Sequence, residues 1–178
     1  MIMINTTIYT LLNKQINAEI WSSYLYRSMS LFAESHGYRG ISNWFYIQSH
    51  EELDHARMIE KYIMAHNHQV KLLPVVEVPC QWSSPLEMFR QALTHEQTIT
   101  RKIGEIFDQA QRDRDYATCS FLSWFIDEQV EEEESCSYLI QQLEKAGDMP
   151  CYFMQIDYEL QQRQYEPNEM KGHSKWYA

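Results

Sequence analysis

Four segments of the chain repeat apolar side chains every three or four residues, which is the spacing of one face of an α-helix. The most informative stripe reads Ile41, Phe45, Gln48, Glu52, His55, Ile59 and Tyr62. Its centre is polar, because Glu52 and His55 form a Glu-x-x-His pair whose members lie one helical turn apart on the same face. A buried carboxylate costs free energy unless a partner compensates its charge, and a metal ion is a partner that also binds histidine. The pattern therefore predicts a helix that presents two metal ligands to the core.

The three other stripes carry acidic side chains in the same way. They read Leu12, Ile16, Glu19, Ser23, Tyr26, Ser30 and Ala33; Leu86, Phe89, Leu93, Glu96, Thr100, Ile103, Phe107 and Ala110; and Leu122, Phe125, Gln129, Glu132, Cys136, Leu139 and Leu143. Each stripe has one glutamate near its middle, namely Glu19, Glu96 or Glu132. Four amphipathic helices can bring such acids together only inside a four-helix bundle.

Capping residues and prolines delimit the helices, since all five prolines lie outside the stripes. Ser84, Pro85 and Glu87 form a strong helix start: a serine cap, proline at the first position, and a glutamate that closes a capping box. Gly147 is a natural C-terminal stop. We expect helices at about residues 6–35, 41–66, 85–112 and 116–145, and a shorter fifth helix at about residues 150–163.

The segment between the second and third helices predicts their connectivity. Residues 67–83 contain two prolines and four valines, so an extended conformation is expected there. At about 3.3 Å per residue the segment spans roughly 50 Å. A helix of nearly thirty residues is about 40 Å long. The connection can therefore return along the whole bundle, which makes the second and third helices parallel.

Composition restricts the class of protein. With 178 residues the chain is long enough for one domain with a sizeable core, which we assign to residues 1–164, followed by a C-terminal tail at residues 165–178. The net charge of −10 argues against a nucleic-acid partner and suits a protein that attracts cations. No stretch is apolar for long enough to span a membrane, and no signal peptide is recognisable, so we expect a cytoplasmic protein. The four cysteines are widely spaced, without a Cys-x-x-Cys pair, so reduced thiols are expected.

Glutamates at the same depth of four helices cannot all remain ionised without a counter-charge. Two carboxylates about 4 Å apart repel by roughly 4 kcal/mol at an effective dielectric constant of 20. Two divalent cations balance four carboxylates, and oxygen-rich ligation with one imidazole suits iron(II) or manganese(II). We expect Glu19, Glu52 and His55 to bind the first ion. Glu52, Glu96 and Glu132 then bind the second, so that Glu52 bridges the pair.

Two neighbours of these ligands leave two interpretations open. Gln129 precedes Glu132 by one turn and holds either a metal-bound water or dioxygen, or only a neighbouring carboxylate. Tyr26 lies two turns after Glu19 and either reaches the site with its hydroxyl or is an ordinary core tyrosine. A bundle with buried, hydrogen-bonded acids and no metal is the alternative for the whole site.

A second acidic set adjoins the first. Glu51, Glu128 and Glu131 are either surface charges or a third cation site. Glu133 and Glu134 are expected on a solvated face. Six histidines lack partners at ligand spacing and are not expected to be ligands: His36, His66, His68 and His173, at surface or turn positions, and His50 and His95, one step off the stripes.

The motifs together carry a family resemblance. They are Asn17-Ala18-Glu19 with Ser22, Ser23 and Tyr26; Glu51-Glu52-Leu53-Asp54-His55; His95-Glu96-Gln97 with Ile99 and Thr100; and Trp124 followed by Glu128-Gln129-Val130-Glu131-Glu132-Glu133. With them the chain resembles bacterial non-haem ferritins of the ferritin-like di-iron superfamily, from Asn5 to about Gln164. The resemblance implies an all-α, ferritin-like four-helix bundle with one long crossover and a short fifth helix.

The resemblance also implies an activity and an assembly. Such proteins form a hollow shell of twenty-four identical subunits, oxidise Fe(II) with O2 or H2O2 at a di-iron ferroxidase centre inside each subunit, and store ferric oxyhydroxide in the shell. The family pattern places Glu19, Glu52 and His55 on one iron, and Glu52, Glu96 and Glu132 on the other, with Gln129 beside them. Its bacterial members add a third iron site, which maps onto Glu51, Glu128, Glu131 and Glu132.

Departures from related families narrow the assignment. Haem-containing bacterioferritins repeat Glu-x-x-His on the fourth helix and have methionine as haem ligand directly after the bridging glutamate. Here Gln129-x-x-Glu132 and Leu53 stand at these positions, so no haem is expected. The fifth helix argues against DNA-protecting mini-ferritins, and the missing Cys-x-x-Cys domain argues against rubrerythrins. A passive iron-binding shell component and a small-molecule oxygenase on the same bundle are the functional alternatives.

Overall fold

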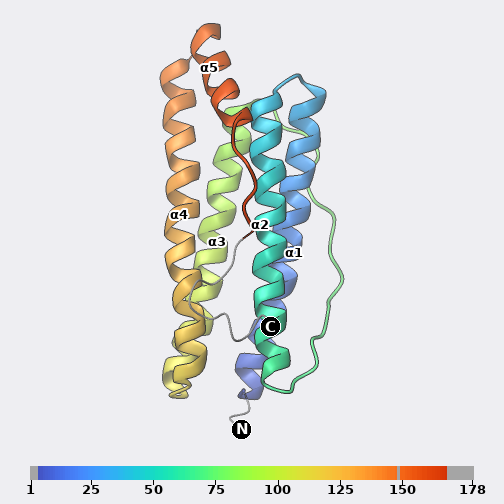
Figure 1. Cartoon of the computed structure of the whole chain (residues 1–178), viewed down its shortest axis with the longest axis vertical. Coiled ribbons are helices and arrows are strands. Elements are labelled where there is room, and N and C mark those ends of the chain that lie inside the picture. The colour runs from blue at the N-terminus through green and yellow to red at the C-terminus, as the bar shows by residue number, and fades with distance from the viewer. Residues whose placement is uncertain (1–3, 148, 168–178) are drawn as a thin grey trace.

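The chain folds into five helices in a computed structural model, which describes residues 4–147 and 149–167. The helices are α1 (Thr6–Ser35), α2 (Arg39–Ala65), α3 (Pro85–Arg112), α4 (Tyr116–Ala146) and α5 (Pro150–Gln161). Helices α1 to α4 run along the long axis of the molecule, and α2 and α3 point in the same direction (Figure 1). The four-helix bundle, its parallel second and third helices and the short fifth helix are therefore confirmed.

Side chains at the helix starts explain where the helices begin. Asn5 accepts a hydrogen bond from the Thr7 amide at 2.8 Å, and Ser84 accepts one from the Glu87 amide at 3.2 Å. The Glu87 carboxylate in turn accepts from the Ser83 amide at 2.5 Å, so the predicted capping box closes on the residue before the cap. Each contact satisfies a backbone N–H group near a helix start that has no partner within the helix.

The crossover between α2 and α3 runs along the outside of α1 for the length of the bundle (Figure 1). Its backbone is tied to α1 at both ends. The Tyr9 hydroxyl donates to the Gln69 carbonyl at 2.7 Å, and the Ser28 hydroxyl donates to the Pro79 carbonyl at 2.7 Å. These contacts hold the extended segment in place without a sheet partner, and they complete the predicted connectivity.

The apolar core is divided into two clusters along the bundle. One cluster includes Ile16, Ala56, Ile99 and Phe125, which come from α1, α2, α3 and α4. The other cluster includes Leu25, Phe45, Ala92 and Cys136 from the same four helices. The positions between the clusters on each helix carry the glutamates of the four stripes. The acids thus lie at one depth, at the middle of the bundle, with an apolar layer on either side.

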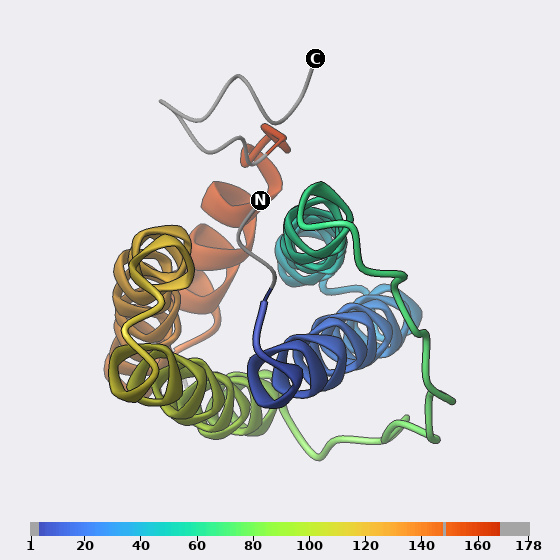
Figure 2. The ribbon, with the colours of Figure 1, turned by 90° about the horizontal axis from the view of Figure 1, so that it is seen from below.

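Helix α5 packs on the side of the bundle formed by α2 and α4 (Figure 2). It approaches α2 so closely at Gly40 that a Cβ atom there would lie 1.6 Å from the Asp157 carbonyl oxygen. The Asp157 side chain accepts from the Ile41 amide at 2.9 Å, and the Asn43 amide group donates to the carbonyls of Leu160 and Arg163 at 3.1 Å and 2.9 Å. The glycine permits this contact because it has no side chain. Consequently the segment that follows α5 descends along α2.

Residues 168–178, which make up most of the predicted tail and include His173, lie outside the described residues. None of the helices in the described ranges is long and apolar enough to cross a membrane.

Candidate metal centre

The middle of the bundle holds five buried ionisable side chains, one or two from each of α1 to α4. The exposed fraction is 1% for Glu19, 2% for Glu52 and His55, 1% for Glu96 and 7% for Glu132. Their burial follows from position alone, since each replaces an apolar side chain on the inward stripe of its helix. The inward placement that the stripes predicted is confirmed.

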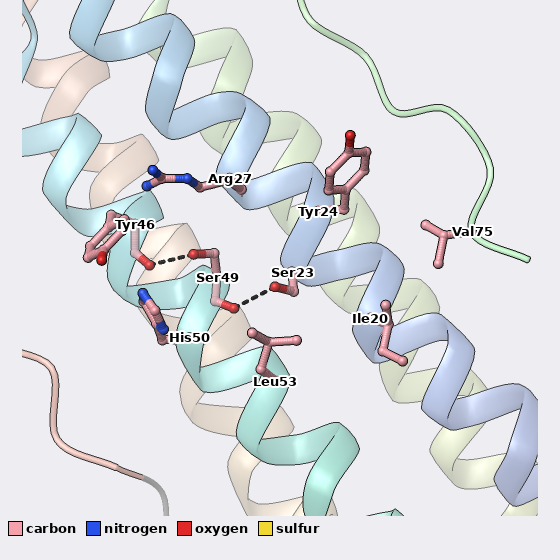
Figure 3. Close-up of a pocket in the computed structure, with 9 residues that line it drawn as sticks. All are labelled: Ile20, Ser23, Tyr24, Arg27, Tyr46, Ser49, His50, Leu53 and Val75. Carbon is pink, nitrogen blue, oxygen red and sulfur yellow. Dashed lines mark hydrogen bonds between the residues drawn. The ribbon is translucent and has the colours of Figure 1, made fainter. Parts of the chain in front are cut away.

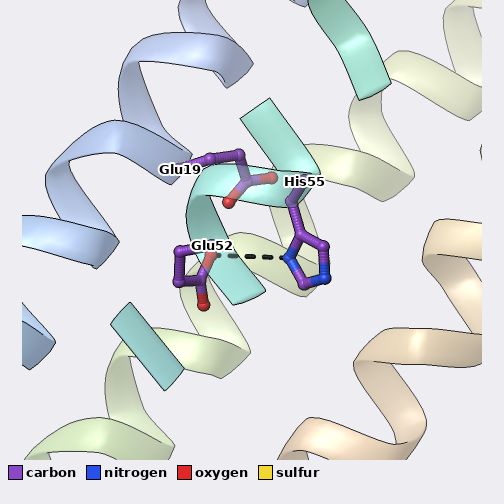
Figure 4. A group of neighbouring side chains, drawn as sticks. All are labelled: Glu19, Glu52 and His55. Atoms are coloured by element: carbon purple, nitrogen blue, oxygen red, sulfur yellow. Dashed lines mark ion pairs between the residues drawn. The ribbon is translucent and has the colours of Figure 1, made fainter. Parts of the chain in front are cut away.

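Glu19, Glu52 and His55 form a compact trio (Figure 4). One ligand atom from each lies within 4.8 Å of the other two, and His55 Nδ1 is 3.5 Å from Glu52 Oε2. Oε2 of Glu19 and Oε2 of Glu52 are buried and accept no hydrogen bond. Buried oxygens left in this state are costly. A divalent cation between the three side chains would supply the missing partner, so the donor set fits a metal ion.

Glu96 and Glu132 are held differently, by neutral donors. The Tyr26 hydroxyl donates to Glu96 Oε1, and the Gln129 amide donates to Glu96 Oε2 at 3.1 Å. The Gln48 amide donates to Glu132 Oε2 at 2.7 Å. Both open interpretations are thereby answered in part, because the Tyr26 hydroxyl does reach the site and Gln129 bonds a carboxylate.

The ligand sets predicted for the two ions therefore differ in how closely their side chains approach one another. Within the described ranges, the group with metal-ligand spacing consists of Glu19, Glu52 and His55 and does not include Glu96 or Glu132. The structure brings together the ligands predicted for the first ion. The second ion, and the bridging role of Glu52, stay predictions.

Burial governs the electrostatics of the centre. Desolvation raises the pKa of Glu96 to about 7 and that of Glu132 to about 8, and it also raises the pKa values of Glu19 and Glu52. Burial alone would lower the pKa of His55, but Glu128, Glu52 and Glu19 outweigh it and raise that pKa well above its usual value. Without cations the centre therefore holds protons near neutral pH, and a metal ion must displace them.

Three polar side chains of the site were given no role by the sequence patterns. Gln15 donates to Glu19 at 2.8 Å, Gln48 donates to Glu132, and Arg163 donates to Gln48 Oε1 at 2.6 Å. Gln48 stands on the second stripe one turn before Glu52, which is a usable signal. Gln15 is one turn before Glu19 but off the stripe. Arg163 is a single basic residue after a short helix, and nothing in its local sequence marks it.

The second acidic set borders a separate pocket of about 290 Å³ beside the centre. The residues that line this accessory pocket are Glu51, Glu128, Glu131, Glu132, Ser135, Arg163, Gln164 and Glu166. Glu128 Oε1 lies 3.8 Å from His55 Nε2, so the pocket adjoins the trio through His55. The structure thus brings Glu51, Glu128 and Glu131 together around one cavity, and it places a cation, Arg163, in the same cavity.

One surface prediction was wrong. Glu133 is half-buried and accepts a hydrogen bond from the Thr100 hydroxyl at 2.6 Å, because α3 packs against this face of α4. His66 stands in the turn that ends α2, which agrees with the predicted surface or turn position, but it is only 9% exposed and its Nδ1 lies 2.9 Å from the Tyr62 carbonyl. Glu134 is exposed, as predicted, and all four cysteines have free thiols.

A larger pocket of about 650 Å³ lies on the outer face of α1 and α2 (Figure 3). Its lining comprises Ile20, Ser23, Tyr24, Arg27, Tyr46, Ser49, His50, Leu53 and Val75. Leu53, which replaces the haem-ligating methionine of bacterioferritins, faces this pocket. None of the residues predicted to bind iron lines it, so the larger pocket is separate from the candidate centre.

Comparisons with known proteins agree with the motifs. The ferritin-like domain model matches residues 9–146. The bacterial non-heme ferritin of Bacteroides fragilis is 37% identical over 161 residues, which covers 90% of this chain and 100% of that protein. The corresponding protein of Staphylococcus saprophyticus is 34% identical over 167 residues, covering 94% and 100%.

Solved structures show the same relationship. The open pore ferritin of Archaeoglobus fulgidus superposes with a TM-score of 0.90 at 39% identity, over 92% of this chain and 100% of that chain. A humanized archaeal ferritin superposes with a TM-score of 0.91 at 36% identity, over 92% and 99%. The family model and these relatives, which cover most of the chain, show that it belongs to the ferritin family.

Proposed function

We propose that this protein stores iron and that each subunit oxidises Fe(II) at the buried centre. The observation that carries the proposal is the trio Glu19, Glu52 and His55 at the middle of a ferritin bundle, where Oε2 of each glutamate is buried without a hydrogen-bond partner. Iron is here the substrate and the stored product. Glu19 and His55 bind the first Fe(II), Glu52 lies between the two ions, and Glu96 and Glu132 bind the second.

The neighbouring side chains set the protonation of the centre. The carboxylates give up their protons as Fe(II) enters, because metal binding requires their ionised form. Tyr26 keeps its proton, since burial and the adjacent Glu96 raise its pKa well above the usual value, and it continues to donate to Glu96. The Gln129 amide fixes the other oxygen of Glu96. The predicted roles of Tyr26 and Gln129 are thus to orient a ligand of the second ion.

Oxidation at the centre balances with two ions. Two Fe(II) ions lose one electron each, and the two electrons, taken up together with two protons, reduce O2 to H2O2 or H2O2 to two molecules of water. The ferric product then passes to a mineral inside a shell of twenty-four subunits, an assembly that is part of the proposal. The formal charge of −10 favours the accumulation of cations by such a shell. The assembled protein is expected in the cytoplasm, without haem, nucleic acid or membrane as a partner.

Stopped-flow absorbance after addition of Fe(II) in air tests the proposal. We expect a rapid oxidation phase in the wild type that is lost in Glu52→Ala and His55→Ala. Glu134→Ala, an exposed residue of the same type on α4, is the matched control and should keep the phase. If the wild type shows no rapid phase, the proposed Fe(II) oxidation is wrong, and the protein is a passive iron-binding shell component.

A small-molecule oxygenase is less well supported. That activity needs an apolar substrate cavity beside the metal ions. The larger pocket contains none of the predicted ligands, and the accessory pocket, which does adjoin them, is lined by glutamates.

A further inference from the structure

The guanidinium group of Arg163 lies in the accessory pocket, where it donates hydrogen bonds to two residues of α2 and lies over the Trp44 ring, 5.4 Å from the ring centroid. Nη2 donates to both carboxylate oxygens of Glu51, at 3.0 Å and 2.8 Å. Nη1 donates to Gln48 Oε1 at 2.6 Å, and the other end of the Gln48 side chain donates to Glu132. Arginine is permanently charged and its hydrogen bonds to a carboxylate are among the stronger ones in proteins. Arg163 is therefore the counter-ion of Glu51.

The backbone around Arg163 is fixed on α2 from both sides. Before it, α5 is docked at Gly40, and the Arg163 carbonyl accepts from Asn43 at 2.9 Å. After it, the Tyr165 hydroxyl donates to Asp54 Oδ2. Asn43 and Asp54 lie about three helical turns apart on one face of α2, so these anchors place residues 162–167, here called the strap, along that face. The position of the guanidinium is set by the docking of the strap rather than by Glu51 alone.

The charges of the pocket explain why a cation belongs there. Five of its lining residues are glutamates, namely Glu51, Glu128, Glu131, Glu132 and Glu166, and Arg163 is the single base among its lining. Glu51 and Glu128 are 12% and 19% exposed, so water screens them only in part. Carboxylates crowded in this way attract a cation, which is either the guanidinium or a metal ion.

We propose that Arg163 is the built-in cation of the accessory pocket, so that a third metal ion can bind there only by displacing its guanidinium from Glu51. The inference rests on the proposed function, because it concerns the number of metal ions held beside the oxidation centre. Arg163 is a positioning residue in this scheme. Through Gln48 it also orients Glu132, which links occupancy of the pocket to a ligand of the second iron.

Titration of the metal-free protein with Zn²⁺, followed by calorimetry, tests the proposal without any oxidation. In Arg163→Gln we expect the third ion per subunit to bind at least about tenfold more tightly than in the wild type, equivalent to about 1.4 kcal/mol. Arg163→Lys, which keeps the charge, should lie between the two. Arg90→Gln removes an exposed arginine that pairs with Glu144 and should match the wild type. An unchanged third step in Arg163→Gln overturns the proposal.

A wild-type crystal soaked in Zn²⁺, with anomalous data at the zinc edge, provides a test that does not depend on a folded variant. Either an empty pocket with Arg163 on Glu51, or zinc on Glu51 with the guanidinium displaced, supports the proposal. Zinc on Glu51 with the arginine contact intact overturns it, as does an empty pocket without Arg163. Failure of the proposed function has a different signature, which is the absence of the first two binding steps and of rapid Fe(II) oxidation in the wild type.

Discussion

The buried centre and the accessory pocket contain the same kind of side chain but neutralise it in different ways. At the centre, Glu19 and Glu52 each have a buried oxygen without a hydrogen-bond donor, and desolvation raises the pKa of both carboxyls. In the pocket, Glu51 is paired with a permanent cation, Arg163. The buried centre can thus bind a cation that exchanges with solvent, whereas the accessory pocket already contains a cation that is part of the chain, the Arg163 guanidinium.

The difference teaches that an acidic cluster is not by itself a metal site. Protons leave the centre when metal enters, and this exchange requires no movement of the chain. In the pocket, a metal ion must compete with a guanidinium that the docked strap holds in place. Gln48 joins the two regions, since it accepts from Arg163 and donates to Glu132. Four experiments test whether the two regions differ in this way.

Glu52→Gln should have the largest effect. It should weaken metal binding by the centre and stabilise the metal-free protein. The amide cannot replace the shared carboxylate, so both metal-binding steps should weaken about 100-fold each, or about 5 kcal/mol in total. The metal-free variant should melt a few degrees higher, because one buried acid is gone. Zn²⁺ calorimetry and thermal unfolding in chelator measure the two effects. Glu134→Gln is the control, and a lower melting temperature for metal-free Glu52→Gln would contradict the account.

The stability of the metal-free protein should fall as pH rises from about 5 to about 8. In this range the folded protein retains protons on Glu96 and Glu132, with pKa values of about 7 and about 8, that the unfolded chain has released. The folded state therefore binds more protons, and the free energy of unfolding decreases with pH. His55 acts in the same direction, because its pKa is also raised. We expect a loss of at least about 3 kcal/mol, which is roughly the contribution of either carboxyl alone over this pH range.

Denaturant unfolding in chelator at several pH values measures this loss. Glu132→Gln should flatten the profile, because it removes a carboxyl whose pKa is raised to about 8. A wild-type stability that stays level or increases over this range would refute the proposed protonation of the centre.

Gln48→Leu should weaken binding of the second ion about tenfold. The substitution removes the donor that orients Glu132 and the acceptor that faces Arg163, and such supporting contacts typically change metal affinity by about 10- to 100-fold. Zn²⁺ calorimetry resolves the second step from the first. Gln97→Leu, at an exposed position of α3, is the matched control. Equal second steps in Gln48→Leu and wild type would show that the two regions are independent.

Tyr165→Phe should have the smallest effect. It removes the hydroxyl that ties the strap to Asp54, at a cost of about 1 kcal/mol in the free energy of unfolding. Denaturant unfolding of this variant and of Tyr158→Phe, whose side chain is exposed, gives the comparison. The loosened strap should also make the third Zn²⁺ step slightly tighter. A third step weaker than that of the wild type would count against the strap as the support of Arg163.

The sequence was sufficient for most of the fold because the determining signals are local. The stripe spacing, the Ser84 cap and the stop at Gly147 predicted helices whose observed ends differ by only a few residues. The burial of Glu19, Glu52, Glu96 and Glu132 followed from the same spacing. The prediction for Glu133 was wrong because its contact with Thr100 on another helix is not encoded in charge patterns.

By itself, then, the sequence determined which residues face the core and which chemistry they can perform, since helical periodicity fixes direction and residue type fixes ligand class. Only the tertiary structure decided how these residues are paired. It placed Tyr26 on Glu96 across 70 positions of the chain, Gln48 on Glu132 across 84, and Arg163 on Glu51 across 112. Such pairs depend on how whole helices pack and on where a segment docks, and no local spacing encodes that geometry.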